Sequence, residues 1–446
     1  MSITLREAFA FKNNFKSIFI PSPQGHRSVD GLRAICCIWV ICHHFALTLQ
    51  GFYPASAFHD FVTDTPWWFS AIWHGELAVD IFFVLSGYLI GATLLREYKK
   101  TGTIIAQRFY LSRLLRLFPC YLLAVLVFLP LLPNKEYVWA NLIQVVNYMP
   151  FDKIFMPWTW SLALQEQFYV LLPPLLLVIL LPSKNRIAIL MALLALSVAV
   201  RVTVLELSPE LKGIHPANFM FFSFENFTPA YFEKLYSGLH VRFGSLIVGL
   251  FGAYVQIYHA EATEKFFTKQ KVITPLYLIS VAIIAYTLLE PYYDLNYTMS
   301  DTLLAFQNAF NYPVFAFATL IILFAAFYAV PVAKPITWFM SSRFWYAPGQ
   351  VSFVMYLFHM LFVGISVVLL QAHTGKITDT SVLQHIPMSA VVGFMLLSIV
   401  LSFVFSLLIS ALVERPFMNM RKMAWFKKVG KSKDIKGSEI PTQQST

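Results

Sequence analysis

Charged residues are scarce in this sequence. Only 13% of its 446 residues are Asp, Glu, Lys or Arg, whereas 58% are hydrophobic. A soluble domain carries roughly 25% charged residues, so the composition excludes an ordinary soluble protein and indicates a membrane protein. The formal charge of +10 does not indicate a nucleic-acid partner, because the basic residues gather in loops on one side of the predicted helices.

Cysteine and the common catalytic motifs are also missing or rare. The four cysteines lie in apolar runs without a spacing suited to zinc, so we expect packing residues and no metal. The sequence lacks GxxxxGK[ST], HExxH and GxSxG, which leaves P-loop nucleotide hydrolysis, zinc proteolysis and nucleophile-elbow chemistry without support. Residues 1–33 lack the apolar core of a signal peptide, so the first helix is expected to direct insertion.

Long apolar runs dominate what is present. A helix needs about 20 residues to cross roughly 30 Å of hydrocarbon, and the sequence predicts an all-α, polytopic membrane protein with about ten such helices in one bundle. We expect a cytoplasmic arm at 1–33, a membrane domain at 34–416 and a basic, largely disordered tail at 417–446. Segment 137–149 is too short to span. The predicted spans are 34–50, 76–95, 117–132, 160–181, 186–206, 243–259, 272–290, 313–331, 350–371 and 388–413.

The distribution of Lys and Arg predicts the orientation. The N-terminal arm, the loops after even-numbered helices and the tail hold 26 of these residues, against 6 in the loops after odd-numbered helices. Basic loops stay on the cytoplasmic side. We therefore expect a multi-pass protein of the cell membrane with both termini in the cytoplasm.

The first predicted helix carries an arginine and a histidine on one face. Arg33 and His44 are eleven residues apart, close to three helical turns, and lie about 16 Å apart along the axis. A polar group inside the bilayer is costly and is a functional candidate by default. His44 could equally be a core histidine bonded to a neighbouring helix.

Two acids are predicted at the depth of His44. Asp80 and Glu166 lie about 6 Å and 9 Å below the outer ends of their helices, with Gln165 one position shallower. A carboxylate beside a histidine fixes its tautomer and raises its basicity, as a general base requires. The alternative is a structural polar network that joins three helices.

Arginines cluster on the predicted inner side. Arg113 and Arg116 are three residues apart and share a helical face. With Arg33 they would suit a multiply phosphorylated ligand, since arginine binds phosphate oxygens in a bidentate manner. An ordinary positive flank of a membrane helix is the alternative.

Later in the chain, His359 lies one turn from Tyr356, and Arg242 leads into the sixth helix from outside, where it could meet a polar substrate. Arg201, inside the fifth helix, could reach the surface or pair with a carboxylate.

In combination, these stretches resemble the acyltransferase-3 family of integral-membrane O-acyltransferases. The family pattern usually has a glutamate where this chain has Gln165, with the acid displaced to Glu166. Whether Glu166 replaces that residue is left open, because adjacent helical residues point about 100° apart. The matching stretches are Asp30-Gly-Leu-Arg33-Ala with His44, Val79-Asp80-Ile-Phe-Phe-Val-Leu-Ser86-Gly87, Arg113-Leu-Leu-Arg116-Leu-Phe-Pro119, Thr159-Trp160-Ser161-Leu with Gln167-Phe168-Tyr169, Tyr356-Leu-Phe-His359 and Glu414-Arg415-Pro416.

The resemblance implies an enzyme that transfers an acyl group, most simply acetyl from acetyl-CoA, to a hydroxyl of a cell-surface carbohydrate or glycolipid. Arg33, Arg113 and Arg116 would bind the phosphates of acyl-CoA, and His44, oriented by Asp80 or Glu166, would act as the base. Ser161, Gln165, Tyr356, His359 and Arg242 are expected to bind substrate or support the site.

Two other classes compete with the enzyme. A multi-pass transporter or flippase would use the same buried charges as a path, and a non-catalytic membrane scaffold would tolerate their substitution. Some relatives carry a fused esterase-like domain, which we do not expect here because only a short tail follows the last helix. Acceptor and oligomeric state are not predicted.

Overall fold

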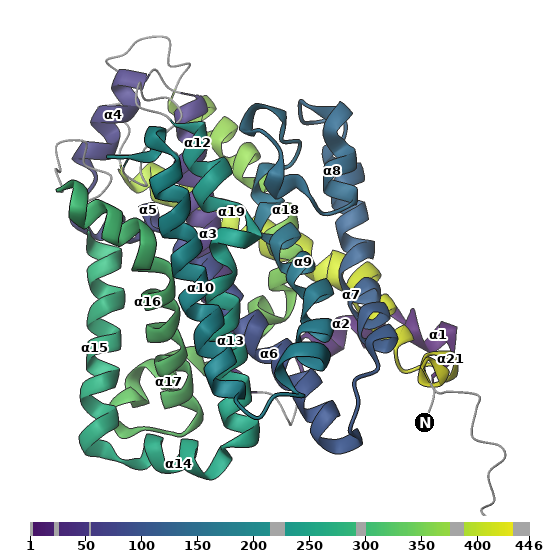
Figure 1. Ribbon diagram of the computed structural model, residues 1–446. Coiled ribbons are helices and arrows are strands. Elements are labelled where there is room, and N and C mark those ends of the chain that lie inside the picture. Colours follow the sequence, from purple (N-terminus) through teal and green to yellow (C-terminus); the bar gives the residue numbers. More distant parts are fainter. Residues whose placement is uncertain are drawn as a thin grey trace, which may run out of the picture.

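The computed structural model describes residues 3–21, 26–52, 55–214, 228–290, 300–374 and 388–430. All regular secondary structure in these ranges is helical. Ten of the described helices are long and apolar enough to cross a membrane, and they form one bundle (Figure 1), which confirms the predicted fold class. They are α3 (Arg27–Thr48), α6 (Leu77–Thr101), α7 (Ala106–Phe128), α9 (Trp160–Pro174), α10 (Arg186–Leu207), α13 (Leu239–Tyr258), α15 (Gln270–Leu289), α16 (Asp301–Phe327), α18 (Tyr346–Thr374) and α19 (Met388–Ile409).

Three helices begin well before the predicted apolar runs. α3 starts at Arg27 rather than 34, α7 at Ala106 rather than 117, and α16 at Asp301 rather than 313. The hydropathy pattern detects only the part of a helix that faces hydrocarbon, whereas the backbone hydrogen bonds continue through polar turns. As a result, the arginines of α7 lie on the helix itself, and Pro119, expected near its start, lies inside it.

α6 and α13 cross at very short range in the centre of the bundle. A Cβ atom added to Gly87 of α6 would lie 2.0 Å from the carbonyl oxygen of Leu246, and one added to Gly249 of α13 would lie 2.1 Å from that of Val84. Small residues permit such close approach of membrane helices. This crossing fixes Asp80, two turns before Gly87, against the N-terminal part of α13.

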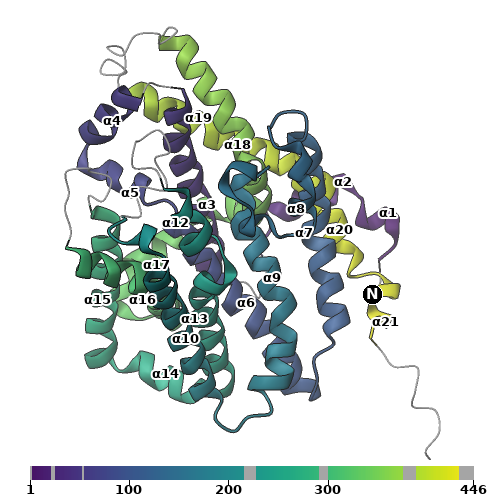
Figure 2. The ribbon, with the colours of Figure 1, turned by 45° about the horizontal axis from the view of Figure 1, so that its top comes forward.

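α3 packs along α18, as Figures 1 and 2 both show. At the entry to α3, a Cβ atom on Gly31 would lie 1.8 Å from the carbonyl oxygen of Met340 in α17 (Lys334–Met340). Its neighbour Asp30 accepts a hydrogen bond of 2.9 Å from Gln350, which in turn accepts one of 2.9 Å from Arg415. The first and last motifs of the chain are therefore joined through α18.

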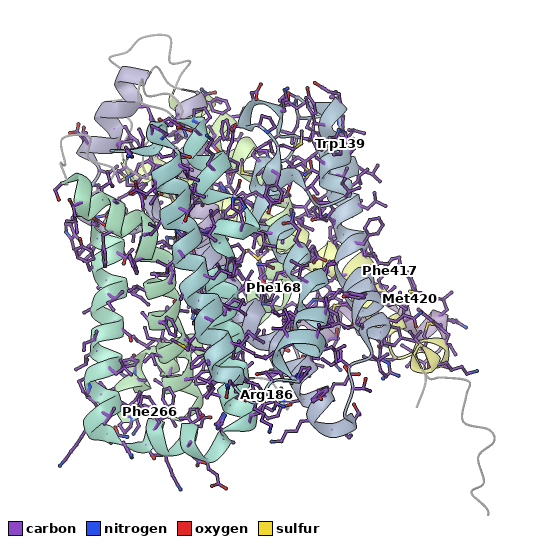
Figure 3. All side chains as sticks on the ribbon, viewed as in Figure 1. Trp139, Phe168, Arg186, Phe266, Phe417 and Met420 are labelled. Atoms are coloured by element: carbon purple, nitrogen blue, oxygen red, sulfur yellow. The ribbon has the colours of Figure 1, made fainter. Side chains whose placement is uncertain are left out.

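Short helices cover both ends of the bundle. Segment 137–149 does not span; it contains α8 (Val138–Leu142) and a 3₁₀ turn at Val146–Tyr148. α4 (Ala55–Asp64) and α5 (Ser70–Trp73) lie at the top of Figure 1 and α14 (Ala260–Thr268) at its lower edge. Figure 3 shows Trp139 at the upper end, and Arg186 and Phe266 at the lower one.

The N-terminal and C-terminal helices meet at the lower right of Figure 1. α19 continues through a π-helical turn, Ser410–Glu414, into α20 (Arg415–Met420). α2 (Phe11–Ile18) contacts α19 and this turn, and α1 (Leu5–Ala8) contacts α20. α21 (Ala424–Lys428) follows beside them. Of the tail predicted at 417–446 to be largely disordered, residues 431–446 lie outside the described residues.

Candidate active site

A cavity of about 370 Å³ opens between α3, α6, α7, α9 and α18. Its volume falls in the range of small-molecule sites, roughly 300–1,000 Å³. Apolar side chains of α6 such as Phe82, Leu85 and Ile90 form part of the wall. The polar lining comes from five helices and includes Arg33, Ser86, Arg96, Arg113, Arg116, Ser161, Gln165, Glu166, Tyr169, Ser352 and Tyr356.

All three arginines predicted to bind phosphate line this cavity. Arg113 and Arg116 are one helical turn apart on α7, and Arg33 joins them from α3. Nε of Arg113 is buried and lacks a hydrogen-bond partner within the described part of the chain. A buried donor without a partner is costly, so this end of the cavity suits an anion.

The sequence did not indicate two further arginines near this end. Arg96 of α6 lines the cavity with an exposed side chain. Arg421, in the segment after α20, donates to Oγ of Ser112 at 3.1 Å. Burial and the nearby Arg116 lower the pKa of Arg421 to about 10, so it stays protonated at neutral pH and adds to the positive potential. Arg421 reaches this end of the cavity because α20 and the residues after it pack against α7.

One face of α9 lines the cavity along its length. Gln165 and Glu166 both reach it, although they are adjacent in sequence, and Tyr169 donates to Oε1 of Gln165 at 3.3 Å. Glu166 is attracted by Arg113 and makes no hydrogen bond to His44 among the described contacts. Gln167 points elsewhere, since its side chain donates to Oδ1 of Asn147 at 2.7 Å.

His44 pairs with a histidine rather than with either acid. Its Nδ1 lies 2.9 Å from Nε2 of His359 in α18, and Nδ1 of His359 lies 2.7 Å from the main-chain oxygen of Tyr356. The hydroxyls of Tyr356 and Ser161 are 2.7 Å apart at the cavity wall. Tyr356 lines the cavity, whereas His44 and His359 are not among its lining residues.

The neighbouring His43 faces a different helix. Its Nδ1 lies 3.1 Å from the main-chain oxygen of Ile72, and its side chain packs against Gly75 next to α5. Because successive helical residues point about 100° apart, only one of the two histidines can face α18. That residue is His44, the histidine that shares a helical face with Arg33.

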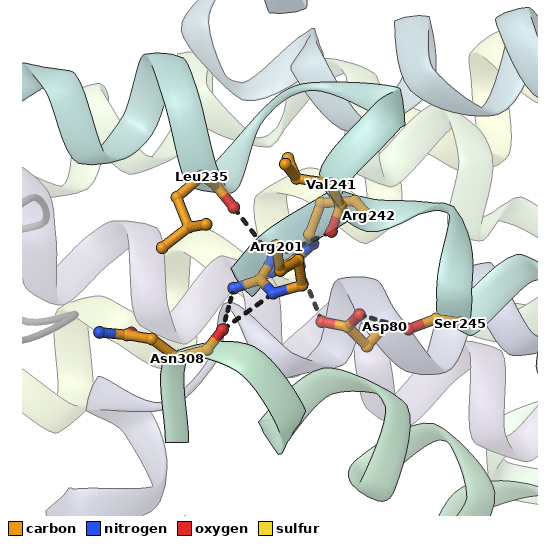
Figure 4. Close-up of polar contacts among 7 residues, drawn as sticks. All are labelled: Asp80, Arg201, Leu235, Val241, Arg242, Ser245 and Asn308. Carbon is orange, nitrogen blue, oxygen red and sulfur yellow. Dashed lines mark hydrogen bonds and ion pairs between the residues drawn. The ribbon is translucent and has the colours of Figure 1, made fainter. Parts of the chain in front are cut away.

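Asp80 does not orient His44, which corrects the sequence-based expectation. Its carboxylate accepts hydrogen bonds from Nη2 of Arg242 and Oγ of Ser245, both at 2.8 Å (Figure 4). The ion pair is fully buried. Arg242 and Ser245 are three residues apart and share a face of α13, so the α6–α13 crossing presents both to Asp80. Arg242, which was expected to contact a polar substrate, forms an ion pair with Asp80 instead.

Arg201 neither reaches the surface nor pairs with a carboxylate. It is 1% exposed and donates to three main-chain oxygens, those of Leu235, Val241 and Asn308 (Figure 4). The ring of Tyr312 lies 4.7 Å from its guanidinium and 3.6 Å from that of Arg242. The main-chain oxygens hold the cation of Arg201, whereas Arg242 has the carboxylate of Asp80 and the ring of Tyr312, with its Nε and Nη1 buried and without a hydrogen-bond partner in the described ranges. Both cations thus belong to a network within the helix packing.

The described helices are those of a multi-pass membrane protein, with a cavity between them that both polar and apolar side chains line. The sequence model of an acyltransferase domain, that of the acyltransferase-3 family, matches residues 26–412, from the start of α3 to the end of the last spanning helix. The chain belongs to this family, as its motifs predicted.

Individual relatives cover a smaller region. A putative O-acetyltransferase of Staphylococcus aureus strain COL is 34% identical over 179 residues, 35% of this chain and 26% of the relative. A peptidoglycan O-acetyltransferase of Listeria monocytogenes is 34% identical over 180 residues, 35% of this chain and 25% of the relative. The matched region thus spans about a quarter of these relatives. No solved structure matches the chain.

Proposed function

We propose that this protein is a membrane O-acyltransferase that moves an acyl group, most simply acetyl, from cytoplasmic acyl-CoA to a hydroxyl of a cell-surface carbohydrate or glycolipid. One observation carries the proposal. A single cavity is lined by three arginines and by Ser161 and Tyr356, whose hydroxyls are hydrogen-bonded. Tyr356 lies one helical turn before His359, which contacts His44. Family membership and the names of the relatives, one of which acts on peptidoglycan, give the reaction class.

The arginine end would bind the donor. Arg33, Arg113 and Arg116 provide a fixed set of donors for phosphate oxygens, and the unpartnered Nε of Arg113 would gain a hydrogen bond. Glu166 would then serve as the resting counter-ion of Arg113 rather than as a catalytic acid. The apolar wall of α6 suits the uncharged arm and acyl group of the donor.

His44 would be the general base. It would take the proton of the acceptor hydroxyl as the oxygen attacks the thioester carbonyl; the new C–O bond forms, the C–S bond breaks, and the proton passes to the leaving thiolate. A positioned base contributes roughly 10²–10⁴-fold to such a reaction. The acceptor would arrive from the outer side, in line with the predicted orientation.

The test is acetyl transfer in membrane vesicles. Vesicles containing the protein are given acetyl-CoA labelled in the acetyl group, together with envelope glycans and lipids as acceptors, and base-labile acetyl esters are identified by mass spectrometry. We expect His44→Ala to abolish labelling while the protein stays inserted, because the base is lost. His43→Ala, the adjacent control, should keep transfer per folded molecule.

Two results would contradict this function. If His44→Ala retained transfer, His44 would have no part in the chemistry. If the wild-type protein moved an unmodified substrate across the vesicle membrane and did not bind acetyl-CoA, the transporter alternative would replace the enzyme.

A further inference from the structure

The contact between His44 and His359 has a definite hydrogen-bond direction. Nδ1 of His359 lies 2.7 Å from the main-chain oxygen of Tyr356, and a carbonyl oxygen can only accept. That nitrogen must therefore carry the hydrogen. A neutral imidazole has one N–H, which makes Nε2 of His359 an acceptor. Nδ1 of His44, 2.9 Å away, must then donate to it, and the free lone pair of His44 is on Nε2.

The surroundings favour a neutral His359. It is completely buried, and a buried charge is costly unless it is paired. Within the described ranges, none of the ion pairs involves either histidine. The titratable groups that face the pair are His43, whose ring centre is 5.6 Å from that of His44, and Tyr356, whose ring centre is 5.6 Å from that of His359. Neither is an anion at neutral pH.

The ring of His359 is held on two sides. The hydroxyl of Tyr356 donates to the main-chain oxygen of Trp158 and is also hydrogen-bonded to the hydroxyl of Ser161. These two hydrogen bonds join this turn of α18 to the start of α9. The indole of Trp158 lies edge-on to His359, with ring centres 6.3 Å apart, and its Nε1 donates to the main chain of Leu357. The acceptor atom offered to His44 thus has a fixed position.

We propose that His359 is the positioning residue of the site: by accepting the hydrogen on Nδ1 of His44, it selects the tautomer whose Nε2 takes the proton from the acceptor hydroxyl. This inference rests on the proposed function, and it assigns to an imidazole the part that the sequence suggested for a carboxylate. An imidazole provides the hydrogen-bond acceptor without a negative charge, so it orients the base and leaves it neutral.

Three substitutions separate this role from simple packing. His359→Leu removes the acceptor, His359→Gln restores one through its side-chain carbonyl, and His359→Glu adds a negative charge. We expect kcat to fall about 100-fold in the leucine variant, the low end of a general-base contribution, with KM for acetyl-CoA unchanged. The glutamine variant should recover to within about tenfold of wild type, since its side-chain carbonyl again accepts the hydrogen on Nδ1 of His44.

The pH profile gives a readout that packing would not move. A carboxylate at 359 stabilises the protonated form of His44, so the acidic limb of the kcat profile should shift to higher pH in His359→Glu and stay in place in His359→Gln. Wild-type kcat in the leucine variant, or a glutamine variant as impaired as the leucine one while equally folded, would overturn the inference.

The tautomer can also be read without any activity. Solid-state nitrogen NMR of ¹⁵N-histidine-labelled protein in membranes, with His44→Ala to identify the signal, should show the Nδ1–H form of a neutral His44 in the wild type. In His359→Leu the main-chain oxygen of Val40 remains a hydrogen-bond partner of the His44 ring, so the Nδ1–H form should lose population to the commoner Nε2–H form. An Nε2–H His44 in the wild type would overturn the inference even if transfer were observed. Conversely, an inactive protein with an Nδ1–H His44 would contradict the proposed function alone.

Discussion

Three ionisable side chains that the sequence placed at one depth have different partners. Asp80 is paired with Arg242, Glu166 lies beside Arg113, and His44 contacts His359. Burying a charge in this setting is tolerated only with a partner close by. The three groups that the sequence suggested would cooperate are therefore divided between a buried ion pair, a cavity lined by arginines and a histidine pair.

Asp80→Asn should destabilise the protein rather than specifically remove its chemistry. The substitution leaves Arg242 buried without its counter-ion, and breaking a buried pair in this way costs about 3–5 kcal/mol. Thermal unfolding in detergent, followed by fluorescence-detected size exclusion, measures the effect. Asp152→Asn, at an exposed position, is the control. Normal stability combined with a complete loss of transfer would instead return Asp80 to the catalytic residues.

Arg116→Gln should weaken donor binding without slowing the chemical step. A hydrogen bond to a charged group is worth roughly 1.5–3 kcal/mol, so KM for acetyl-CoA should rise at least about tenfold while kcat stays within a factor of about two. Initial rates at varied acetyl-CoA concentration give both constants. Lys135→Gln, a basic residue remote from the cavity, should change neither. An unchanged KM in the arginine variant would remove Arg116 from the donor site.

At the scale of elements, close helix crossings determine which residues meet. Because α6 and α13 touch through Gly87 and Gly249, Asp80 is directed to α13 and away from α3. α18 packs on α3 and supplies His359 to His44. α9, joined to α18 through Ser161 and Tyr356, carries both Gln165 and Glu166 into the cavity.

Gly87→Ala should loosen the central crossing. The added methyl group would meet the carbonyl oxygen of Leu246, a backbone atom that can move only with its helix, and overpacking of this kind costs about 1–3 kcal/mol. The melting temperature in detergent should fall. At Gly364 a Cβ atom meets nothing within 4 Å, so Gly364→Ala is the matched control. Equal melting temperatures for the two variants would contradict the close crossing.

At the scale of the whole molecule, polar groups separate toward the two ends of the bundle. Asp80 and Arg242 lie in the first turns of α6 and α13, toward the end with α5, whereas α14 follows the other end of α13. The arginines of α7 lie in its first half, which follows the far end of α6 and so belongs to the end with α14. This polarity would let a donor and an acceptor enter from opposite sides of the membrane.

Cysteine labelling should reveal the orientation. Lys265→Cys lies on α14 and Lys135→Cys in the turn after α7, and both positions are exposed. With basic loops retained in the cytoplasm, an impermeant maleimide should label the cysteine at 135 in intact cells and that at 265 only after permeabilisation. The unsubstituted protein, in which Cys36, Cys37 and Cys120 are buried, gives the background. The reverse pattern would invert the topology.

The amino-acid sequence was sufficient to predict the class of the protein, through ten apolar runs, their helical nature, the family motifs, and the face shared by Arg33 and His44. These features follow from composition and from the helical repeat, which are local properties. The partner of each buried ionisable group became clear only from the packing of the helices. Asp80, Glu166 and His44 have similar predicted depths, but depth does not specify the direction of a side chain around its helix axis or the neighbour that it meets. Those depend on contacts between helices distant in sequence, such as α6 with α13 and α3 with α18.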